Sequence, residues 1–487
     1  MIGNIRYKKQ RRNMMTACVA KKERSLFLKL ILYAIPIMLT GLLQLLYNTA
    51  DQIVVGQFSG DPNALAAVGS SSALNGLIAG FCIGITSGSN VIIARFIGAK
   101  NGEGVSRAVH TSMTFSLLIG LGVCALGLGV AKPMHLLLGT MPNVFDDALL
   151  YTIIIMAGVP AVSVYNFGAV VFRAAGDSKT PFIILALSGL LNVGFNLFFV
   201  IVCKMGVEGV AIATIISQYA SAIVVVVLMM RLKDDRKFSL SKMRIDRKLL
   251  GQILVIGVPS AVQGSLFAVS NMILQSSVNM LGASYNSESV VTGNTIGTTL
   301  EGYTYVLTNA FYHATVTYVG QFYGARDKKN IKRTLIYSLI QSATVGIAVS
   351  WLIIGLSEPL TMVFVNADEK NIADVIKYAS ERIFITQSLY FSVGVMEVLT
   401  GYLRALGRSI IPMFSSVFSI CVVRVLWAFF IFPIPAMYSL TGLYMIYPIS
   451  WILCSLLHFI TILVVSKKIF PKNPKEQITD EQSEAVA

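Results

Sequence analysis

An aspartate, Asp51, lies inside the first long apolar segment of the chain, in the stretch 44-QLLYNTADQIVVG-56. Inserting a charged residue at the centre of a bilayer costs about 2.5–3.5 kcal/mol on insertion scales. A charged residue found there is therefore expected to have a function. Gln44 and Asn48 precede Asp51 by seven and three residues, which puts the three side chains on one helix face. A carboxylate away from bulk water can load and release a proton near neutral pH. We expect Asp51 to have such a functional role, and its alternative interpretation is a permanently hydrogen-bonded structural aspartate.

Three other ionisable side chains lie well inside apolar segments: Glu301, Glu397 and Arg424. A rise of about 1.5 Å per residue places Glu301 and Arg424 at overlapping depth in a core of about 30 Å, with Glu397 nearer the inner face. Because an unpaired arginine at mid-membrane is expensive, we predict that Arg424 faces the protein interior and bonds Glu301, directly or through one water. A second interpretation of Glu301 is an ion ligand beside Glu397.

Aromatic and histidine side chains accompany these acids. The face of an aromatic ring attracts a cation, so rings near a carboxylate could hold an organic cation in a cleft. The candidates are Tyr303, Tyr305, Tyr312, Tyr390 and Phe391. His313 could relay protons, since imidazole changes charge near neutral pH, and its alternative interpretation is a polar packing residue.

Long apolar segments carry all of these residues. The chain has 487 residues, 55% hydrophobic and 13% charged, with a mean hydropathy of +0.70, whereas soluble domains carry about 25% charged residues. Apolar runs of about 20 residues can cross a bilayer, and the sequence lacks the dyad alternation of a membrane β-barrel. We predict an all-α polytopic membrane protein with twelve transmembrane helices at 26–58, 64–97, 104–131, 147–172, 181–203, 207–231, 249–281, 289–323, 331–357, 372–403, 410–433 and 438–466.

The basic residues are distributed unequally between the two sides of the predicted membrane. Of the 39 Lys and Arg, 33 fall in the ends and alternate loops on one side. Arg424 lies within a helix, and the other side holds five: Lys132, Lys204, Lys370, Lys377 and Arg382. The positive-inside rule makes the basic side cytoplasmic, which predicts a plasma-membrane protein with both termini in the cytoplasm. Topology accounts for the net charge of +15, so we expect no nucleic-acid partner.

The second half of the chain repeats the first. The stretch 95-RFIGAK-100 matches 321-QFYGAR-326, and 172-FRAAGDSKTPF-182 matches 403-LRALGRSIIPM-413. One constant offset pairs residues in the first helix of each half: Pro36 with Pro259, Gly41 with Gly264, Asn48 with Asn271, and Gln52 with Gln275. Because each repeat holds an even number of spans, we predict two six-helix lobes related by a pseudo-two-fold axis along the membrane normal, with a cleft at the midplane.

The repeat defines the expected domain organisation. We predict a cytoplasmic tail at 1–25, an N-lobe at 26–232, a basic linker at 233–248, a C-lobe at 249–466 and a second cytoplasmic tail at 467–487. Pro36 and Pro259 each remove a backbone hydrogen bond at the equivalent place in the two lobes. We interpret them as hinges. We expect a monomer surrounded by lipid.

These repeat signatures resemble the multidrug and toxic compound extrusion (MATE) family. The resemblance covers about 26 to 466 and depends on 36-PIMLTGLLQLLYNTADQIVVG-56, on the loops FRAAGDSKTP and LRALGRSIIP, and on 192-NVGFNLFFVIVCKMGVEGVAIAT-214. It implies a secondary active antiporter that exports organic compounds, often cationic and amphipathic, in exchange for protons or sodium ions. It implies no resident cofactor beyond a possible bound sodium ion, and it favours a bacterial membrane.

The resemblance also suggests roles at matching positions. Asp51 matches a proton- or cation-binding aspartate in the first helix of the family. Many proton-coupled members have a second Asp in the fifth helix, four residues after an Asn, whereas this chain has Asn192 and then Asn196. An amide cannot titrate, which leaves Asp51 as the acid of the N-lobe.

The C-lobe departs from the sodium-coupled pattern. Such relatives hold their ion with carboxylates in helices 7 and 10, but helix 7 here offers Asn271 and Gln275 without an acid. Glu397 matches the helix alone, not a motif position. We therefore predict coupling residues Asp51, Glu397 and Glu301, with the supporting polar residues Gln44, Asn48, Asn192, Asn196, Asn271, Gln275 and Arg424.

Each half carries one Arg-x-x-Gly-x-x-x-x-Pro loop. Arg173 and Arg404 begin these short turns, and Gly176 and Gly407 permit left-handed backbone. The proline five residues after each glycine is expected to be the first residue of the next helix. We interpret both loops as structural and expect no contact with substrate.

Other functions leave different signatures. A flippase for lipid-linked sugars shares this architecture, but the sequence suggests a single intramembrane arginine where pyrophosphate would need several. An intramembrane enzyme would need a His-Glu-x-x-His helix, an aspartate dyad or a Ser–His pair at matched depth, and none is apparent. A channel is disfavoured because matched bundles with hinge prolines indicate alternating access. The sequence thus predicts a non-enzymatic exporter of drug-like molecules.

Overall fold

The computed structural model describes residues 25–59, 63–137, 139–285, 287–365 and 371–469. Nearly all of the two predicted tails, 1–25 and 467–487, lies outside this part of the chain. In the described part the secondary structure is helical throughout. The major helices are α2 (Leu26–Phe58), α3 (Ala64–Gly98), α4 (Gly102–Leu137), α5 (Pro142–Ala174), α6 (Lys179–Leu197), α7 (Val207–Arg231), α8 (Arg247–Ser284), α9 (Ser289–Gly324), α10 (Lys328–Gly355), α12 (Ile372–Ser388), α13 (Phe391–Ala405) and α17 (Ile446–Ile469).

Shorter helical pieces complete the later spans and connections. The segment after α13 runs as one span through α14 (Ile410–Ser416), the π-helical turn η3 (Val417–Val422), α15 (Val423–Leu426) and a second π-helical turn η4 (Trp427–Ile431). The other short elements are η1 (Phe198–Val202), η2 (Leu240–Lys242), α11 (Ser357–Met362) and α16 (Leu440–Tyr444).

The twelve predicted spans correspond to these helices. Ten described helices are long and apolar enough to cross a membrane, and α12 with α13, bent by 44° at their junction, forms an eleventh such span. The twelfth is α9, whose threonine, glycine, asparagine and tyrosine content lowers its hydropathy. Large apolar side chains such as Leu126 and Phe430 are each 70% exposed, as expected for surfaces that face lipid.

Local capping explains where several helices begin. Ser25 accepts a hydrogen bond from Leu28 N at the start of α2. Asp246 accepts from Lys248 N and Leu249 N at the start of α8. Such side-chain acceptors satisfy N–H groups that have no partner within the first helical turn.

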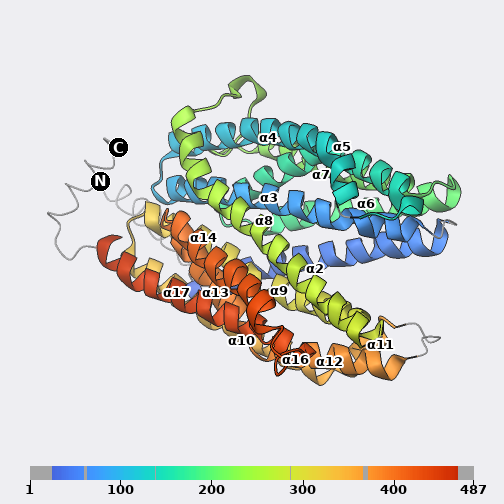
Figure 1. The fold of residues 1–487 in the computed structure, drawn as a ribbon. Coiled ribbons are helices and arrows are strands. Elements are labelled where there is room, and N and C mark those ends of the chain that lie inside the picture. The colour runs from blue at the N-terminus through green and yellow to red at the C-terminus, as the bar shows by residue number, and fades with distance from the viewer. Residues whose placement is uncertain (1–24, 60–62, 138, 286, 366–370, 470–487) are drawn as a thin grey trace, which may run out of the picture.

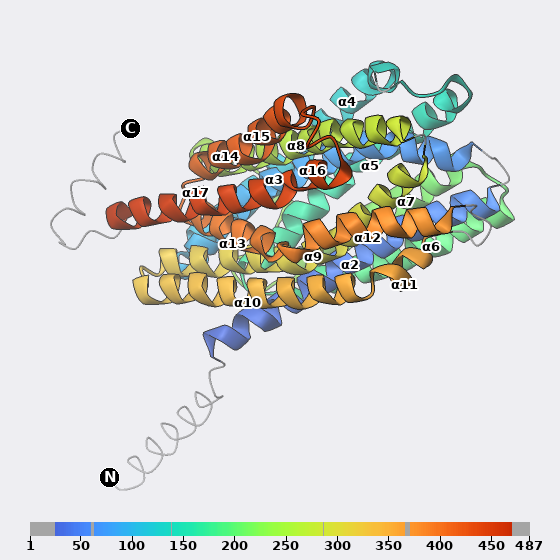
Figure 2. The ribbon, with the colours of Figure 1, turned by 60° about the horizontal axis from the view of Figure 1, so that its bottom comes forward.

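The helices form two lobes. In Figure 1, α4, α5, α6 and α7 group on one side with α2 and α3, and α10, α12, α13 and α17 group on the other; in the view of Figure 2 the two groups overlap. Helix α8 crosses between the groups in Figure 1, because its first half packs on α3 and its second half packs in the C-lobe. The linker between α7 and α8 lies at one end of the bundle, which we call the linker end.

The lobes meet through a reciprocal contact that reveals the pseudo-two-fold axis. Gly98 of α3 packs against the backbone of Gln321 in α9, and Gly324 of α9 packs against the backbone of Arg95 in α3. A side chain at either glycine would collide with main-chain atoms. Such an exchange of equivalent positions is what two-fold symmetry requires. The sequence repeat is therefore a structural repeat.

The two Arg-x-x-Gly loops have the same backbone. Gly176 and Gly407 adopt φ of 87° and 79°, which confirms the predicted left-handed turns. The prediction that the following prolines are first helical residues is wrong, because α6 and α14 begin two residues before Pro181 and Pro412. Proline is tolerated there because the N–H groups of the first turn have no intrahelical acceptor.

Candidate functional site

A cavity of about 370 Å³ lies between the lobes, and both lobes line it. A volume of this order suits a small organic molecule. The N-lobe contributes residues of α2, α3 and α5, and the C-lobe contributes residues of α8, α9 and α13. The polar and charged lining residues are Thr40, Gln44, Thr86, Ser87, Asn90, Tyr165, Asn166, Arg173, Ser260, Gln263, Tyr305, Asn309, Tyr312, His313, Glu397 and Arg404.

Hydrogen bonds between the lobes close the cavity toward the linker end. The Arg95 guanidinium donates to the Ala405 carbonyl at 2.8 and 3.2 Å, and Gln321 Nε2 donates to the Ala174 carbonyl at 2.7 Å. Tyr33 Oη and Thr317 Oγ1 lie 2.9 Å apart in the buried interface. Toward the opposite end the two lobes diverge in Figure 1. The cavity is thus sealed at the end that the sequence predicts to be cytoplasmic.

Two arginines and one glutamate supply the charge of the cavity wall: Arg173, Arg404 and Glu397. Arg404 is 7% exposed and donates to Tyr312 Oη and to Gln263 Oε1, each at 2.7 Å. The arginines of both Arg-x-x-Gly loops therefore border the cavity, although the sequence indicated a structural role for these loops. Each arginine is in the last turn of a helix, and the cavity reaches that depth.

The aromatic candidates separate into two groups. Tyr305 and Tyr312 line the cavity, and His313 lies beside Tyr312 with ring centroids 5.1 Å apart. The other three lie outside the residues that line it. Tyr390 packs edge-on against Trp451, Tyr303 packs on the apolar cluster of α9, α10 and α12, and Phe391 contacts α10 at Gly346.

The predicted polar stripe on α2 divides between two environments. Gln44 lines the cavity, whereas Asp51, two helical turns later, contacts α6 within the N-lobe. Asn196 Nδ2 donates to Asp51 Oδ1 at 2.5 Å. Asn48 lies between them with an exposed side chain. The carboxylate is therefore bonded inside one lobe and separated from the cavity along the same helix.

The N-lobe polar cluster extends from Asp51 into α6 and α7. Asn196 Nδ2 also lies 3.4 Å from Asn192 Oδ1, and Asn192 Nδ2 donates to Thr214 Oγ1 at 3.2 Å. Asn196 is fully buried, and its Oδ1 accepts no hydrogen bond from the described residues. Carboxylate, amide and hydroxyl oxygens are the donors that a hard cation prefers. The cluster offers oxygen ligands beside one acid.

The C-lobe acid Glu301 is held by an arginine that the sequence placed elsewhere. Arg382 of α12 is 2% exposed, and its Nη2 lies 3.0 Å from Glu301 Oε1 and donates to Oε2 at 3.2 Å. Arg382 Nη1 also donates to Asn294 Oδ1 at 2.6 Å. The Asn294 amide in turn donates to Gln275 Oε1 at 2.7 Å. Arg382 was assigned to the outer loops because it lies only ten residues into its helix.

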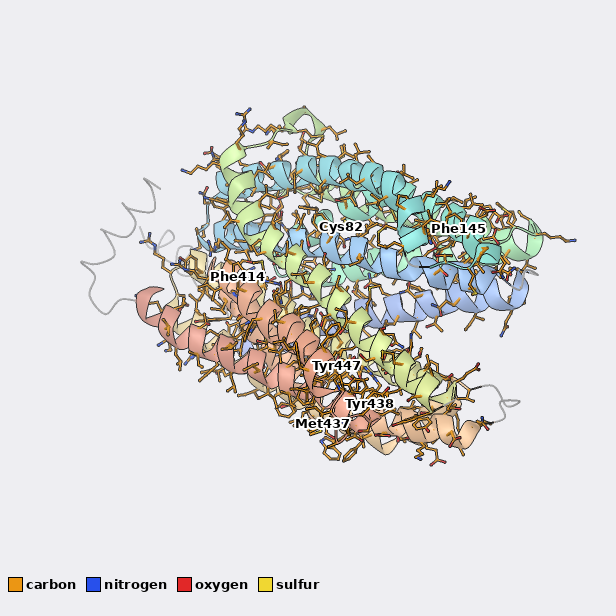
Figure 3. The ribbon with its side chains drawn as sticks, in the orientation of Figure 1. Cys82, Phe145, Phe414, Met437, Tyr438 and Tyr447 are labelled. Carbon is orange, nitrogen blue, oxygen red and sulfur yellow. The ribbon has the colours of Figure 1, made fainter. Side chains whose placement is uncertain are left out.

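Among the described residues, the predicted direct bond between Arg424 and Glu301 is not formed. Arg424 does face the lobe interior, with 3% exposure, but its Nη1 donates to Asn271 Oδ1 at 2.9 Å and its Nε to Ser450 Oγ at 3.0 Å. The Tyr447 ring, marked in Figure 3, lies 4.6 Å from the Arg424 guanidinium carbon and 4.9 Å from that of Arg382. Aromatic and amide groups take the place of the expected carboxylate.

Comparison with known protein families identifies the family of this chain. The MatE family model matches residues 36–198 and 259–430, which together make up more than half of the chain. The chain belongs to the MatE family. Each match begins at the proline that the internal repeat pairs, Pro36 and Pro259, so the two family matches and the two lobes are the same units.

Curated MatE relatives align over most of the chain. A probable multidrug resistance protein of Bacillus subtilis (strain 168), YoeA, is 27% identical over 416 residues, covering 84% of this chain and 88% of that protein. A probable multidrug resistance protein of Thermotoga maritima, NorM, is 27% identical over 416 residues, covering 82% of this chain and 84% of that protein. The chain is therefore a membrane transporter of a multidrug efflux family.

A solved structure confirms the MatE fold. A MOP superfamily transporter from Pyrococcus furiosus superposes with a TM-score of 0.83 at 21% identity, covering 90% of this chain and 96% of that protein. The twelve-helix, two-lobe architecture predicted from the sequence is thereby confirmed.

Proposed function

We propose that this MatE-family chain is a secondary antiporter that exports amphipathic organic compounds in exchange for protons or sodium ions. The central cavity supports the proposal, because both lobes line it and their contacts seal it at one end. Alternating access would break these contacts and form equivalent ones at the other end. On this proposal the transporter is a monomer in a bacterial plasma membrane, with the linker end and both termini in the cytoplasm.

One observation carries the coupling proposal: the Asp51 carboxylate bonds Asn196 across the α2–α6 contact. A proton or sodium ion at Asp51 would compete with this hydrogen bond, since each uses the same carboxylate oxygens. Ion occupancy would then change how α2 packs on α6. An ion drives transport only to the extent that its affinity differs between the two states, typically by about 1–3 kcal/mol.

Helix α2 connects this acid to the substrate cavity. Gln44 lines the cavity two turns before Asp51, and Pro36 lies inside the same helix. Because proline lacks one backbone hydrogen bond, a rearrangement at Asp51 can bend the helix and alter the cavity wall at little cost. Pro259 inside α8 would allow the matching bend in the C-lobe.

The C-lobe acids would act differently. Glu301 is committed to Arg382, which supports a structural role. Glu397 lines the cavity, so we assign it to the substrate site rather than to ion coupling. Glu397 and the rings of Tyr305 and Tyr312 also support the expectation of a cationic substrate.

A gradient experiment tests the proposed function. Purified protein in liposomes would be given a proton gradient, a sodium gradient or neither, and uptake of a fluorescent amphipathic dye would be followed. We expect uptake with one of the two gradients and at most slow equilibration without them. Equal uptake in all three conditions would contradict antiport, and gradient-independent movement of lipid-linked saccharide would favour the flippase.

A flippase for lipid-linked saccharides is a second candidate function, because the structure buries more arginines than the sequence suggested. The sequence suggested a single intramembrane arginine, yet Arg382 and Arg424 are buried in the C-lobe and two more arginines line the cavity. A cavity with guanidinium groups can bind phosphate as well as carboxylate.

A further inference from the structure

We propose that the sealed end of the cavity is an anion-recognition site and that the exported compounds carry a carboxylate. The site consists of Arg173 from the N-lobe and Arg404 from the C-lobe, which occupy equivalent positions in the sequence repeat. The inference rests on the proposed export function and names its substrate class. The exported compounds, which the family resemblance suggests are often cationic, would then also carry an anionic group.

Arg404 is a buried guanidinium with donor capacity left over. Its two terminal nitrogens are fixed by Tyr312 Oη and Gln263 Oε1, and its Nε is buried without a hydrogen-bond acceptor among the described residues. Arg404 is 7% exposed and borders the cavity. An unpaired buried donor on a charged group is expensive, so the position favours a ligand that supplies an acceptor.

Arg173 brings a second, uncommitted charge to the same wall. Its side chain is half-buried, and no described residue hydrogen-bonds or ion-pairs with its guanidinium. The backbone around it is fixed, because the Arg173 carbonyl accepts a hydrogen bond from Tyr33 Oη. Because the backbone of Arg173 is fixed and its guanidinium has no hydrogen-bond or ion-pair partner among the described residues, this side chain is suited to binding a ligand in the cavity.

The charge balance of the wall favours an anion. The lining residues with a formal charge are Arg173, Arg404 and Glu397, so the wall holds at least one positive charge in excess. A single carboxylate on the bound molecule would make the cavity neutral. Planar guanidinium groups bind carboxylates through paired hydrogen bonds, which gives both affinity and orientation.

The rest of the cavity suits an apolar body. Ile37, Phe267, Val306 and Val316 line it together with the Tyr305 ring. Glu397, on the same helix as Arg404 and two turns before it, can accept a cationic group of the same molecule. The structure therefore fits a zwitterionic or anionic amphipath better than a molecule whose only charge is positive.

Equilibrium binding of a matched dye pair tests the proposal. Rhodamine B carries a carboxylate, and its ethyl ester is nearly the same molecule without that negative charge. Both would be titrated by fluorescence anisotropy into the full chain in phosphatidylcholine nanodiscs, with no ion gradient, so that failed coupling cannot mask binding. We expect the acid to bind about tenfold tighter than the ester, the size of a hydrogen bond to a charged group.

Arg173→Gln isolates the guanidinium, because that group bonds no other described residue and its loss should leave the fold intact. We expect the preference for the acid to fall about tenfold, with the cationic ester bound no more weakly than by the wild type because a repelling charge is removed. Arg408→Gln is the control, since Arg408 is exposed, follows Arg404 by four residues and is not a cavity residue. Its acid preference should equal that of the wild type.

Two results would overturn the proposal. The first is tighter binding of the ester, or an acid preference that Arg173→Gln leaves intact. The second comes from nanodiscs that contain phosphatidylglycerol. If this lipid abolishes acid binding to the wild type but not to Arg173→Gln, the arginines serve a lipid phosphate and not a carboxylate substrate. Unchanged acid binding in those nanodiscs supports the proposal.

Discussion

The same pair of helices carries opposite charge in the two lobes. In the N-lobe, α2 meets α6 through the Asp51 carboxylate and the Asn196 amide. In the C-lobe, the equivalent α8 meets the span of α14 and α15 through the Asn271 amide and the Arg424 guanidinium. Both lobes place an amide against a charged side chain where their first and fifth spans meet, but the charge lies on the first span in the N-lobe and on the fifth in the C-lobe, with opposite sign. We therefore propose that the first contact binds a cation, whereas the guanidinium at the second would repel one.

The surroundings reinforce this difference. In the C-lobe the guanidinium groups of Arg382 and Arg424 lie 4.9 and 4.6 Å from the Tyr447 ring, and the Glu301 carboxylate pairs with Arg382. Sodium or a proton entering there would meet excess positive charge. Two lobes of one fold thus have different tasks: we infer that the N-lobe binds the coupling ion and that the C-lobe interior is a rigid support.

The largest effect on transport is expected at Asp51. Asp51→Asn keeps the shape of the side chain and removes its charge, so gradient-driven export should fall by about 100-fold, the upper part of an ordinary coupling range. Dye uptake into proteoliposomes under the effective gradient measures this. Dye binding without a gradient should be unchanged, and wild-type export by the variant would exclude the coupling role.

The largest effect on stability is expected at the Glu301–Arg382 pair. Arg382→Met leaves a buried carboxylate without its partner and should destabilise the fold by about 3–5 kcal/mol. The double variant with Glu301→Gln should recover part of this loss, because no orphaned charge remains. Thermal unfolding of the detergent-solubilised proteins compares them. A double variant less stable than Arg382→Met alone would refute the pairing.

A matched pair of amide variants compares the lobes directly. Asn196→Leu and Asn271→Leu each remove one hydrogen bond to a charged group, worth about 1.5–3 kcal/mol. We expect Asn196→Leu to reduce gradient-driven export about tenfold, and Asn271→Leu to lower the unfolding temperature while the export of the folded fraction stays near normal. Equal transport defects in the two variants would contradict the proposed functional difference between the lobes.

The smallest effect is expected from adding an acid to the C-lobe. Asn271→Asp places a carboxylate against Arg424, where it would form an ion pair and stabilise the lobe by about 1 kcal/mol or less. It should not raise the number of ions exchanged per dye, because the guanidinium occupies the new carboxylate. A changed stoichiometry in proteoliposomes would show that the C-lobe can host a coupling ion.

The sequence predicted the architecture well because hydropathy and repetition are local properties. The bounds of α2 and α7 agree with the predicted 26–58 and 207–231, and the left-handed turns at Gly176 and Gly407 follow from short motifs. The position of Asp51 in the first helix was likewise visible from its apolar neighbours.

Side-chain pairing was less predictable because depth alone does not specify a partner. Arg424 and Glu301 lie at compatible depths in the membrane. The rotation and packing of their helices nevertheless place Arg424 against Asn271, and Glu301 against Arg382. The sequence counts Arg382 with the basic residues of the outer side, yet it lies in the interior of α12, ten residues after the helix begins. The cavity role of Arg173 and Arg404 depends on where the lobes separate, which no single helix encodes.

Ion release on dye binding tests the central claim most directly. Purified wild-type protein, the double variant Glu301→Gln with Arg382→Met, and Asp51→Asn would be mixed with saturating dye in weakly buffered solution, with a pH indicator and a sodium-selective electrode recording release. We predict release of protons or sodium ions from the wild type and from the double variant, which leaves no orphaned charge, and none from Asp51→Asn. Undiminished release from Asp51→Asn, or loss of release in a folded double variant alone, would contradict the assignment of coupling to the N-lobe.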